Sequence, residues 1–354
     1  MNRQLPAHVR EAIERTSRAS LVFDRGAIEA NMRRIAAAAR AADIRVLFAA
    51  KSFPHAAVHA LAAELCDGFD LASPAEVHGA PACAIASIAD PSGAAIAAAG
   101  TARARRVIVS CETPEQAAAA PAGVDIAVRV SASITGRDPA IGAVLEGSGR
   151  RRSRFGVESR EAVAAIARAA GARRIGLHVH HGTVIATTGE RFVATAHAAI
   201  EAAGFEPAFV NLGGAWHGIP DIAAAFATVR AALPPSIELL VEPGRAYADG
   251  AGFACGRITA ARSLADRELV VCELSRICHL QWSAVDLVAT APRPGEGRNV
   301  LVVGPTCFEE DVIGEWTCAP PTAGDRIVLR GLTGYALAWN AGFAGIPPAH
   351  VEIV

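Results

Sequence analysis

Short apolar runs alternate with Ala-rich helical stretches from about residue 21 to residue 245. Eight of these runs read as strands, and they begin near Val46, Phe69, Ile85, Val107, Ile126, Ile175, Phe209 and Glu238. Helix-like segments lie between them, among them Ile28–Ala41, Pro54–Cys66, Ser159–Ala170, Glu190–Ala203 and Asp221–Ala232. Because alternation of strand and helix is typical of parallel sheets, the pattern predicts an α/β fold with a closed (β/α)8 barrel of the TIM type over residues 21–245.

The pattern changes after Gly244. Residues 246–354 are rich in Val, Ile, Leu, Gly and Pro and contain few long helical stretches. Strand-like runs occur there at Leu269–Cys272, Asn299–Val303 and Arg326–Leu329. We expect a separate C-terminal β-rich domain, and the pattern leaves open whether residues 1–20 join it.

Polar residues follow several of the predicted barrel strands. Lys51 ends the apolar run that starts at Arg45, and the later runs end in His178–Thr183, Asn211–Gly214 and Glu242–Arg245. The carboxyl ends of barrel strands meet at one mouth, where barrel enzymes place their chemistry. Each group also has a structural explanation: a core histidine, a Gly-Gly turn, or a surface ion pair. Their coincidence at one mouth favours an active site.

Lys51 is the most informative of these residues. A desolvated lysine favours its neutral amine, which is a nucleophile toward carbonyl groups. The structural alternative is a side chain that extends to solvent along its apolar stem.

Composition excludes several classes of protein. A net charge of −1, from 34 basic and 35 acidic residues, gives no field that would attract nucleic acid or an anionic membrane. No uncharged apolar stretch of about 18 residues predicts a membrane span, and the charged first 20 residues do not read as a signal peptide. The eight cysteines form no CxxC pair, so we expect neither a metal site nor a disulfide framework, and a reducing cytoplasmic setting.

The chain resembles the decarboxylases of the alanine-racemase-like barrel fold (fold type III) that depend on pyridoxal 5′-phosphate (PLP), the group of the ornithine, arginine and diaminopimelate decarboxylases. The resemblance runs from Leu21–Asp24 almost to the C-terminus. Its blocks are Phe48–Ser52, Gly68–Glu76, His178–Thr183, Asn211–Gly214, Glu242–Arg245, Gly304–Cys307 with Asp311, and Gly334–Tyr335. No single block is specific, but all of them occur in the family's order.

The resemblance implies a role for each matching position. Lys51 is similar to the lysine that binds PLP covalently, and His180 to the imidazole stacked on the cofactor ring. Asp70 and Glu76 resemble residues that support them, and Arg129 an arginine near the cofactor's O3′. The phosphate site would comprise Thr183, Gly213, Gly214, Gly244, Arg245 and Tyr335. Cys307 resembles a cysteine that reaches a neighbouring subunit's site, which implies a homodimer with shared active sites.

Glu242 resembles the carboxylate beside the cofactor's pyridine nitrogen. PLP stabilises a carbanion at Cα when that nitrogen is protonated, and a carboxylate keeps the proton in place. In the related alanine racemases an arginine takes this role. A glutamate therefore favours decarboxylation, so we expect Lys51, Cys307, His180 and Glu242 to be the catalytic residues.

Two departures from the family concern the substrate. Phe308 stands where the decarboxylases of basic amino acids carry an acidic residue, and a phenyl ring cannot balance a buried ammonium group. Val271–Arg276 replaces a turn that usually contains Asp-Gly, and Arg276 could face an anionic substrate. These two departures predict an anionic or acylated amino acid in specialised metabolism, such as siderophore biosynthesis. The expected substrate-binding residues are Cys307, Phe308, Asp311 and Arg276.

Three questions stay open in the sequence. The chain could be an amino-acid racemase of the same fold, or a non-catalytic PLP-binding protein, although 109 residues follow the barrel. The basic cluster Arg150-Arg151-Arg152 with Arg154 could be an anion site or a solvated loop. Glu309 or Glu310 could replace the acidic residue missing at Phe308.

Overall fold

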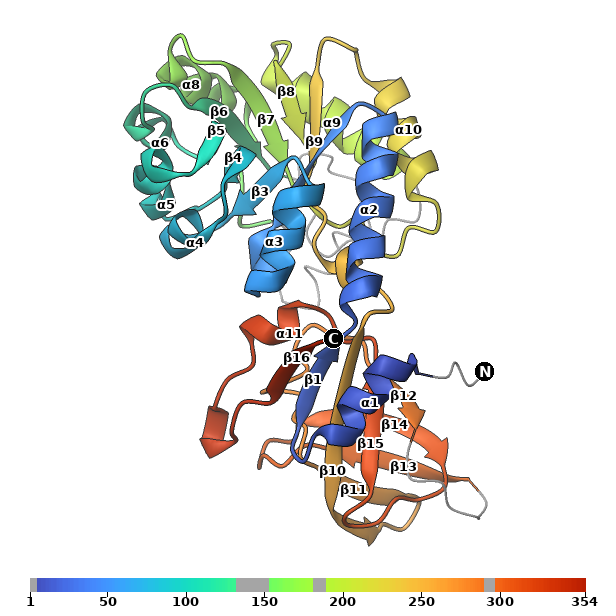
Figure 1. The fold of residues 1–354 in the computed structure, drawn as a ribbon. Coiled ribbons are helices and arrows are strands. Elements are labelled where there is room, and N and C mark those ends of the chain that lie inside the picture. Colours follow the sequence, from blue (N-terminus) through green and yellow to red (C-terminus); the bar gives the residue numbers. More distant parts are fainter. Residues whose placement is uncertain (1–4, 132–152, 181–188, 290–296) are drawn as a thin grey trace. The chain divides into compact units, whose positions relative to one another are not determined.

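The computed structural model describes residues 5–131, 153–180, 189–289 and 297–354. The chain forms two compact units (Figure 1). The barrel unit comprises residues 32–51 and 56–246, and the sheet unit comprises residues 1–31, 52–55 and 247–354. No helix in the described part of the chain is long and apolar enough to cross a membrane.

Eight parallel strands form the barrel (Figure 1). They are β2 (Ile44–Ala49), β3 (Gly68–Leu71), β4 (Cys83–Ile88), β5 (Ala104–Cys111), β6 (Asp125–Val130), β7 (Ile175–Val179), β8 (Phe209–Asn211) and β9 (Glu238–Val241). The ring closes because β9 pairs with β2, with Ile44 in register with Leu239. The predicted closed (β/α)8 barrel is confirmed, and all eight predicted strands are present.

Helices alternate with these strands along the chain. They are α2 (Arg25–Ala41), α3 (Ala56–Leu65), α4 (Pro74–Gly79), α5 (Ala94–Ala98), α6 (Pro114–Ala119), α8 (Arg160–Ala170), α9 (Glu190–Ala203) and α10 (Ile222–Ala232). Several start at capping residues: Ser159 and Asp221 accept from backbone N–H groups in the first turns of α8 and α10. Thr113 forms a capping box with Gln116 at α6. Each cap contributes about 1 kcal/mol to the helix and sets where it begins.

The side chains inside the barrel change from apolar to polar along its axis. A buried apolar layer fills the middle with Leu47, Ile85, Ile108, Ala127, Phe209 and Leu240. Side chains two residues apart on a strand point to the same face. The residues two positions further along are Ala49, Ser87, Ser110, Arg129, Asn211 and Glu242, so a polar layer lies at the carboxyl mouth.

The opposite end of the barrel is closed by ion pairs. Arg106 contacts Asp125 at 2.7 Å and Glu238 at 2.9 Å, and Arg174 contacts the same two carboxylates. Both guanidinium groups lie over the ring of Phe209, at 5.2 and 5.1 Å from its centroid. Charged side chains therefore cover the apolar layer at this end of the barrel.

The sheet unit is built on one eight-stranded sheet. Its main path runs β12-β15-β10-β11-β13-β14, while β1 pairs with both β10 and β16. The bounds are β1 (Ser20–Phe23), β10 (Gly252–Ser263), β11 (Glu268–Cys272), β12 (Asp286–Ala289), β13 (Arg298–Val303), β14 (Val312–Cys318), β15 (Arg326–Arg330) and β16 (His350–Ile353). The predicted strands at residues 269–272, 299–303 and 326–329 correspond to β11, β13 and β15. The unit also contains helices α1 (Ala7–Arg15) and α11 (Tyr335–Ala338).

The boundary between the units differs from the predicted one at residue 21. Strand β1 pairs with β10 in the sheet unit, and α1 packs there through Val9, Ala12 and Ile13. Arg326 donates hydrogen bonds to the carbonyls of Ile13 and Thr16, which end α1. A four-residue apolar strand has the same pattern in either unit, so the sequence alone could not assign β1.

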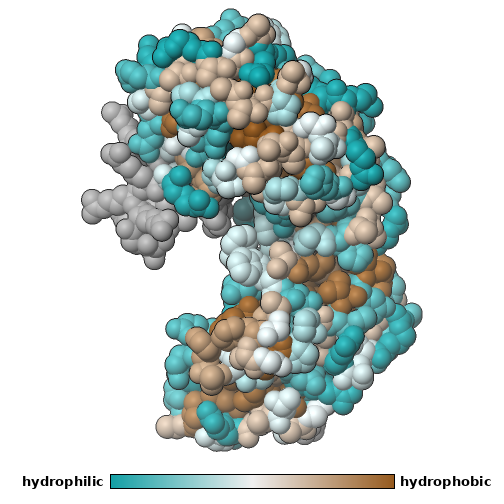
Figure 2. Space-filling model, turned by 90° about the vertical axis from the view of Figure 1, so that its left-hand side faces the viewer, coloured by the Kyte–Doolittle hydropathy of each residue, from teal (hydrophilic) through white to brown (hydrophobic). Residues whose placement is uncertain are grey.

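Hydrophobic residues reach the surface in separate groups among hydrophilic ones on the face drawn in Figure 2. Among the described residues, the large hydrophobic side chains that are exposed all belong to the sheet unit: Leu264, Trp282, Phe308, Val312, Trp339 and Phe343. The barrel unit buries its large hydrophobic side chains more completely.

Candidate active site

Lys51 lies at the carboxyl mouth of the barrel. It follows β2 in a short 3-10 turn (Ala50–Ser52), and its Nζ forms an ion pair with the carboxylate of Asp70 on β3. Burial raises the pKa of Asp70, as does the negative charge of Glu242, while Lys51 opposes both effects. The Oδ1 atom of Asp70 is buried and has no hydrogen-bond partner among the described residues.

Glu242 is buried in the polar layer and held by neighbouring strands. Its Oε1 accepts hydrogen bonds from Asn211 Nδ2 at 2.6 Å and Ser87 Oγ at 3.3 Å. Its Oε2 lies 3.5 Å from Nε2 of His178. Burial by itself would raise the pKa of Glu242, but His178 and the Lys51 ammonium outweigh burial and hold the pKa well below its usual range. The site therefore keeps an ionised carboxylate under the mouth.

His178 is itself fixed from the other side. Its Nδ1 shares a 2.6 Å hydrogen bond with Ser110 Oγ. Its Nε2 is buried and has no hydrogen-bond partner in the described structure, although it faces Glu242. Ser110 on β5 thus positions His178 on β7, whose ring lies beside the Glu242 carboxylate.

The turn after β8 packs against His180. Gly213 has φ of +64°, and a Cβ there would lie 2.8 Å from Cδ2 of His180. A Cβ on Gly214 would lie 3.0 Å from Nε2 of the same ring. The carbonyl of Gly213 accepts from the backbone N–H of Glu242 and from the indole of Trp216, both at 2.8 Å. These contacts require glycines at the turn and hold its backbone rigidly.

His180 is a neutral imidazole in this setting. Burial lowers the pKa of His180 to about 3, and the positive charges of Arg129 and Lys51 act in the same direction. Its ring is half-buried and leans on the Gly213–Gly214 turn. A flat, uncharged ring of this kind can lie against another aromatic ring.

Residues 25–249 match the family model of the pyridoxal-dependent decarboxylases, over their pyridoxal binding domain. The chain belongs to this family. No curated protein matches the chain at a significant level.

Solved structures of decarboxylases share the fold of both units. The lysine/ornithine decarboxylase of Vibrio vulnificus is 20% identical with a TM-score of 0.79, covering 99% of this chain and 100% of that one. The arginine decarboxylase of Paramecium bursaria Chlorella virus is 15% identical with a TM-score of 0.79, covering 98% of each chain. The diaminopimelate decarboxylase of M. jannaschii is 18% identical with a TM-score of 0.78, covering 97% and 88%.

The residues at the mouth of this pyridoxal-dependent decarboxylase fit its cofactor, PLP. Asp70 offers a buried oxygen without a partner, Glu242 is a buried ionised carboxylate, and the Gly213–Gly214 backbone leaves room beside His180. A primary amine is also required, and Lys51 is the only lysine among the 34 basic residues. The count of lysines therefore identifies Lys51 independently of any motif.

Four further residues of the polar layer were not predicted as site residues: Ser87, Ser110, His178 and Asn211. The signal for them was present, because each lies two positions beyond a residue of the apolar layer or at the end of its strand. Which face of a strand points inward depends on register between strands. The register between neighbouring strands cannot be read from the sequence alone.

Two predicted cofactor residues have clear local roles. Glu76 lies in the first turn of α4, and its Oε2 accepts from the backbone N–H of Ala72 at 2.7 Å. Burial raises the pKa of Glu76. Glu76 therefore supports the end of β3 next to Asp70. Arg245 opens a 3-10 turn (Arg245–Ala248) directly after Gly244 and β9.

Three predicted site residues are not among the described residues of the barrel unit. Thr183 is outside the described residues. Tyr335 belongs to the sheet unit, where its ring centroid lies 5.1 Å from that of Trp282. Cys307 is exposed in the same unit. Their roles toward the cofactor and the substrate stay predictions.

Asp311 has a different environment from the one expected of a substrate-binding residue. Its carboxylate is buried and accepts hydrogen bonds from Ser275 Oγ, the backbone N–H of Arg276, and the backbone and side chain of Thr306. It joins the turn at Arg276 to the segment that carries Cys307. Arg276 donates from Nη1 of its guanidinium to the carbonyl of Ser283.

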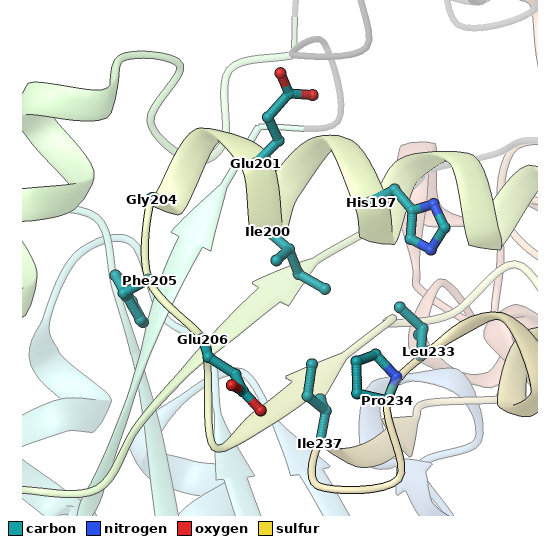
Figure 3. Close-up of a pocket in the computed structure, with 9 residues that line it drawn as sticks. All are labelled: His197, Ile200, Glu201, Gly204, Phe205, Glu206, Leu233, Pro234 and Ile237. Atoms are coloured by element: carbon teal, nitrogen blue, oxygen red, sulfur yellow. The ribbon is translucent and has the colours of Figure 1, made fainter.

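A surface groove of about 680 Å³ lies away from this chemistry (Figure 3). It is lined by the end of α9 and the segment before β9, at the amino-terminal ends of the strands, with Ile200, Phe205, Leu233 and Ile237 among its side chains. It contains neither Lys51 nor any residue of the polar layer. The Lys51 mouth is therefore the candidate active site.

Proposed function

We propose that this decarboxylase removes CO2 from an amino acid, or amino-acid derivative, whose side chain is anionic or acylated. The observation that carries the reaction is the buried Glu242 carboxylate, kept ionised by its surroundings and held by Asn211 and Ser87. A carboxylate in this state can hold a proton on the pyridine nitrogen of PLP, which decarboxylation requires.

Different residues of the chain would have different roles around the cofactor. When bound, PLP withdraws electrons from the substrate Cα. Lys51 would hold the cofactor covalently, and Asp70, which forms an ion pair with Lys51 Nζ, would orient that side chain. His180 would present a neutral ring to the cofactor, and Arg129 would lie near the cofactor's O3′. The phosphate would be held by Gly213, Gly214, Gly244, Arg245, Thr183 and Tyr335.

Phe308 supports the substrate class. It is exposed, and its ring meets that of Phe343 edge-on with centroids 5.2 Å apart. The solved decarboxylases with this fold hold cadaverine, agmatine or L-lysine, all of which carry a cationic group. An aromatic pair at this position provides no charge for such a group. A role in specialised metabolism, such as siderophore synthesis, is consistent with this difference.

We further propose a homodimer in which Cys307 serves the partner's site and returns a proton to the substrate Cα. The exposed Cys307 and the six exposed hydrophobic side chains of the sheet unit support an interface there. The eight cysteines are all free thiols, which supports a reducing setting such as the cytoplasm.

The test is CO2 release from a panel of L- and D-amino acids, with the products analysed for chirality. We expect turnover of acidic or acylated amino acids and weak turnover of ornithine and lysine. Strong turnover of ornithine or lysine with no preference for anionic substrates would refute the proposed substrate class. Inversion at Cα without CO2 would indicate a racemase instead.

A further inference from the structure

Residues 153–157 form an edge beside the carboxyl end of β6. The backbone N–H of Ser131 donates to the carbonyl of Val157 at 3.0 Å, and the N–H of Val157 donates to the carbonyl of Arg129 at 2.9 Å. Gly156 allows this approach, because it has φ of +79° and a Cβ would lie 2.5 Å from Ser131 N. The segment is thereby fixed next to Arg129, at the same mouth as Lys51.

Two guanidinium groups lie against the ring that this segment presents. The Cζ atom of Arg154 is 3.8 Å from the ring centroid of Phe155, and that of Arg129 is 5.3 Å from it. Within the described structure, neither arginine forms an ion pair. Cation–π contacts hold each guanidinium on the ring, yet the two positive charges repel each other. An anion that binds to both guanidinium groups would offset that repulsion.

This pair adjoins the residues around Lys51. Arg129 is in register with His178 on β7, so its side chain starts from the same inward face as the polar layer. Its charge is one of the causes that lower the pKa of His180. Arg154 is exposed, so a solute entering from solvent can reach it, whereas Arg129 is half-buried.

We propose that Arg154 and Arg129, held on Phe155, form a subsite for a second carboxylate of the substrate. The inference rests on the proposed function and specifies its substrate class as amino acids with an additional acidic group. The carboxylate that leaves as CO2 loses its charge in the transition state. Pairing it with two cations would therefore stabilise the ground state more than the transition state and slow the reaction. A second carboxylate, which stays on the substrate, keeps its charge in the transition state. Pairing it with the two cations therefore does not slow the reaction.

The main test compares Arg154→Met with the wild-type holoenzyme. The substrates are matched pairs of an acidic amino acid and its amide, such as glutamate with glutamine and their one-carbon homologues. Because the pair acts on binding, we expect KM for the acidic member to rise about tenfold, with kcat changed less than twofold and the amide unaffected. Arg154→Lys keeps the charge but lacks the planar guanidinium group. Its KM for the acidic substrate should lie between those of the wild type and Arg154→Met.

A second readout needs no turnover. Calorimetry measures binding of glutarate, used as the probe, to each holoenzyme. We expect Arg154→Met to weaken it about tenfold and Phe155→Leu to weaken it less, because the ring only supports the guanidinium groups. Arg168→Gln, on the exposed side of α8, is the matched control and should leave glutarate binding unchanged.

The outcomes separate the subsite from the proposed function. A wild-type enzyme that releases no CO2 from any amino acid refutes the proposed function, whatever glutarate does. An active enzyme whose acid-to-amide preference and glutarate affinity survive Arg154→Met refutes the subsite alone. Loss of PLP from Arg154→Met, with glutarate binding intact, would instead assign Arg154 to the cofactor.

Discussion

At the scale of single residues, we propose Lys51 as the cofactor-binding residue because no other side chain of this protein offers a primary amine. Its ion pair with Asp70 keeps the ammonium form in place. A nucleophilic amine must be unprotonated, and a carboxylate beside an amine favours its protonated form, so the Asp70 position bears on the reactivity of Lys51.

Replacing Lys51 with arginine separates its charge from its amine. Lys51→Arg keeps a cation for Asp70, but a guanidinium cannot bind PLP covalently. We expect CO2 release to fall at least about a thousandfold. After borohydride reduction and proteolysis, mass spectrometry should find a pyridoxyl group on the Lys51 peptide of the wild type and none on the variant peptide. A variant that stays yellow and fully active would contradict the assignment.

His180 makes the stability of the cofactor-free protein sensitive to acid. Its pKa is lowered to about 3 in the fold, against about 6.5 in an unfolded chain. Below pH 6.5, His180 therefore binds a proton in the unfolded state but stays unprotonated in the native state until the pH falls toward 3. Stability is lost as pH falls from 6.5 toward 3, by up to about 1.4 kcal/mol per pH unit.

We therefore expect His180→Gln to flatten this dependence. Urea unfolding at several pH values between 6.5 and 4 should show a smaller loss of unfolding free energy in the variant than in the wild type. His197→Gln, at an exposed position on α9, is the control and should keep the wild-type slope. Equal slopes in all three proteins would show that His180 titrates normally.

At the scale of elements, the Gly213–Gly214 turn depends on an aromatic support behind it. Trp216 donates its indole N–H to the Gly213 carbonyl and stacks on Phe192, with ring centroids 3.7 Å apart and an interplanar angle of 8°. Ala215 adopts φ of +70°, which is strained for a residue with a Cβ. The surrounding contacts therefore enforce the shape of the turn.

Trp216→Phe tests this support, since it keeps an aromatic ring but removes the donor. We expect a loss of about 1 kcal/mol in unfolding free energy and weaker retention of PLP on dialysis. Trp216→Leu also removes the stacked ring, and should cost about 3 kcal/mol. Unchanged PLP retention in both variants would limit Trp216 to a packing role.

The elements of the barrel were predictable because they carry local signals. Each barrel strand is an apolar run, and helices such as α8 and α10 begin at the capping residues Ser159 and Asp221. Lys51, His180 and Glu242 were predictable because they follow strands. Ser87 and Ser110 were not, since only strand register shows which face they share. Asp311 was assigned by motif, but its burial and hydrogen bonds arise from contacts with a turn that lies about 35 residues earlier.

At the scale of the whole molecule, the two units differ in what they expose. The barrel unit carries the Lys51 site, while the sheet unit carries the exposed Cys307 and all of the exposed large hydrophobic side chains among the described residues. Two pairs of these side chains are in ring contact, Trp282 with Trp339 and Phe308 with Phe343, and apolar side chains that gather on a surface often mark protein–protein interfaces. The asymmetry supports a homodimer in which each site combines residues from two chains.

Mixing two inactive variants tests this arrangement. Lys51→Ala and Cys307→Ala homodimers each lack a residue in both sites. If sites are shared between chains, a mixed dimer has one site with both residues intact and one with neither. Random exchange makes about half of the dimers mixed, so reassociation should restore about a quarter of the wild-type activity.

The same experiment contains its own control. If Lys51 and Cys307 of one chain served the same site, every site of a mixed dimer would lack one of the two, and activity would stay at the level of the separate variants. Exchange must be verified by native mass spectrometry of differently tagged chains, because a dimer that does not exchange would also show no recovery. Verified exchange without recovery would therefore place Cys307 outside the partner's site, and the sheet unit's exposed apolar side chains would need another explanation.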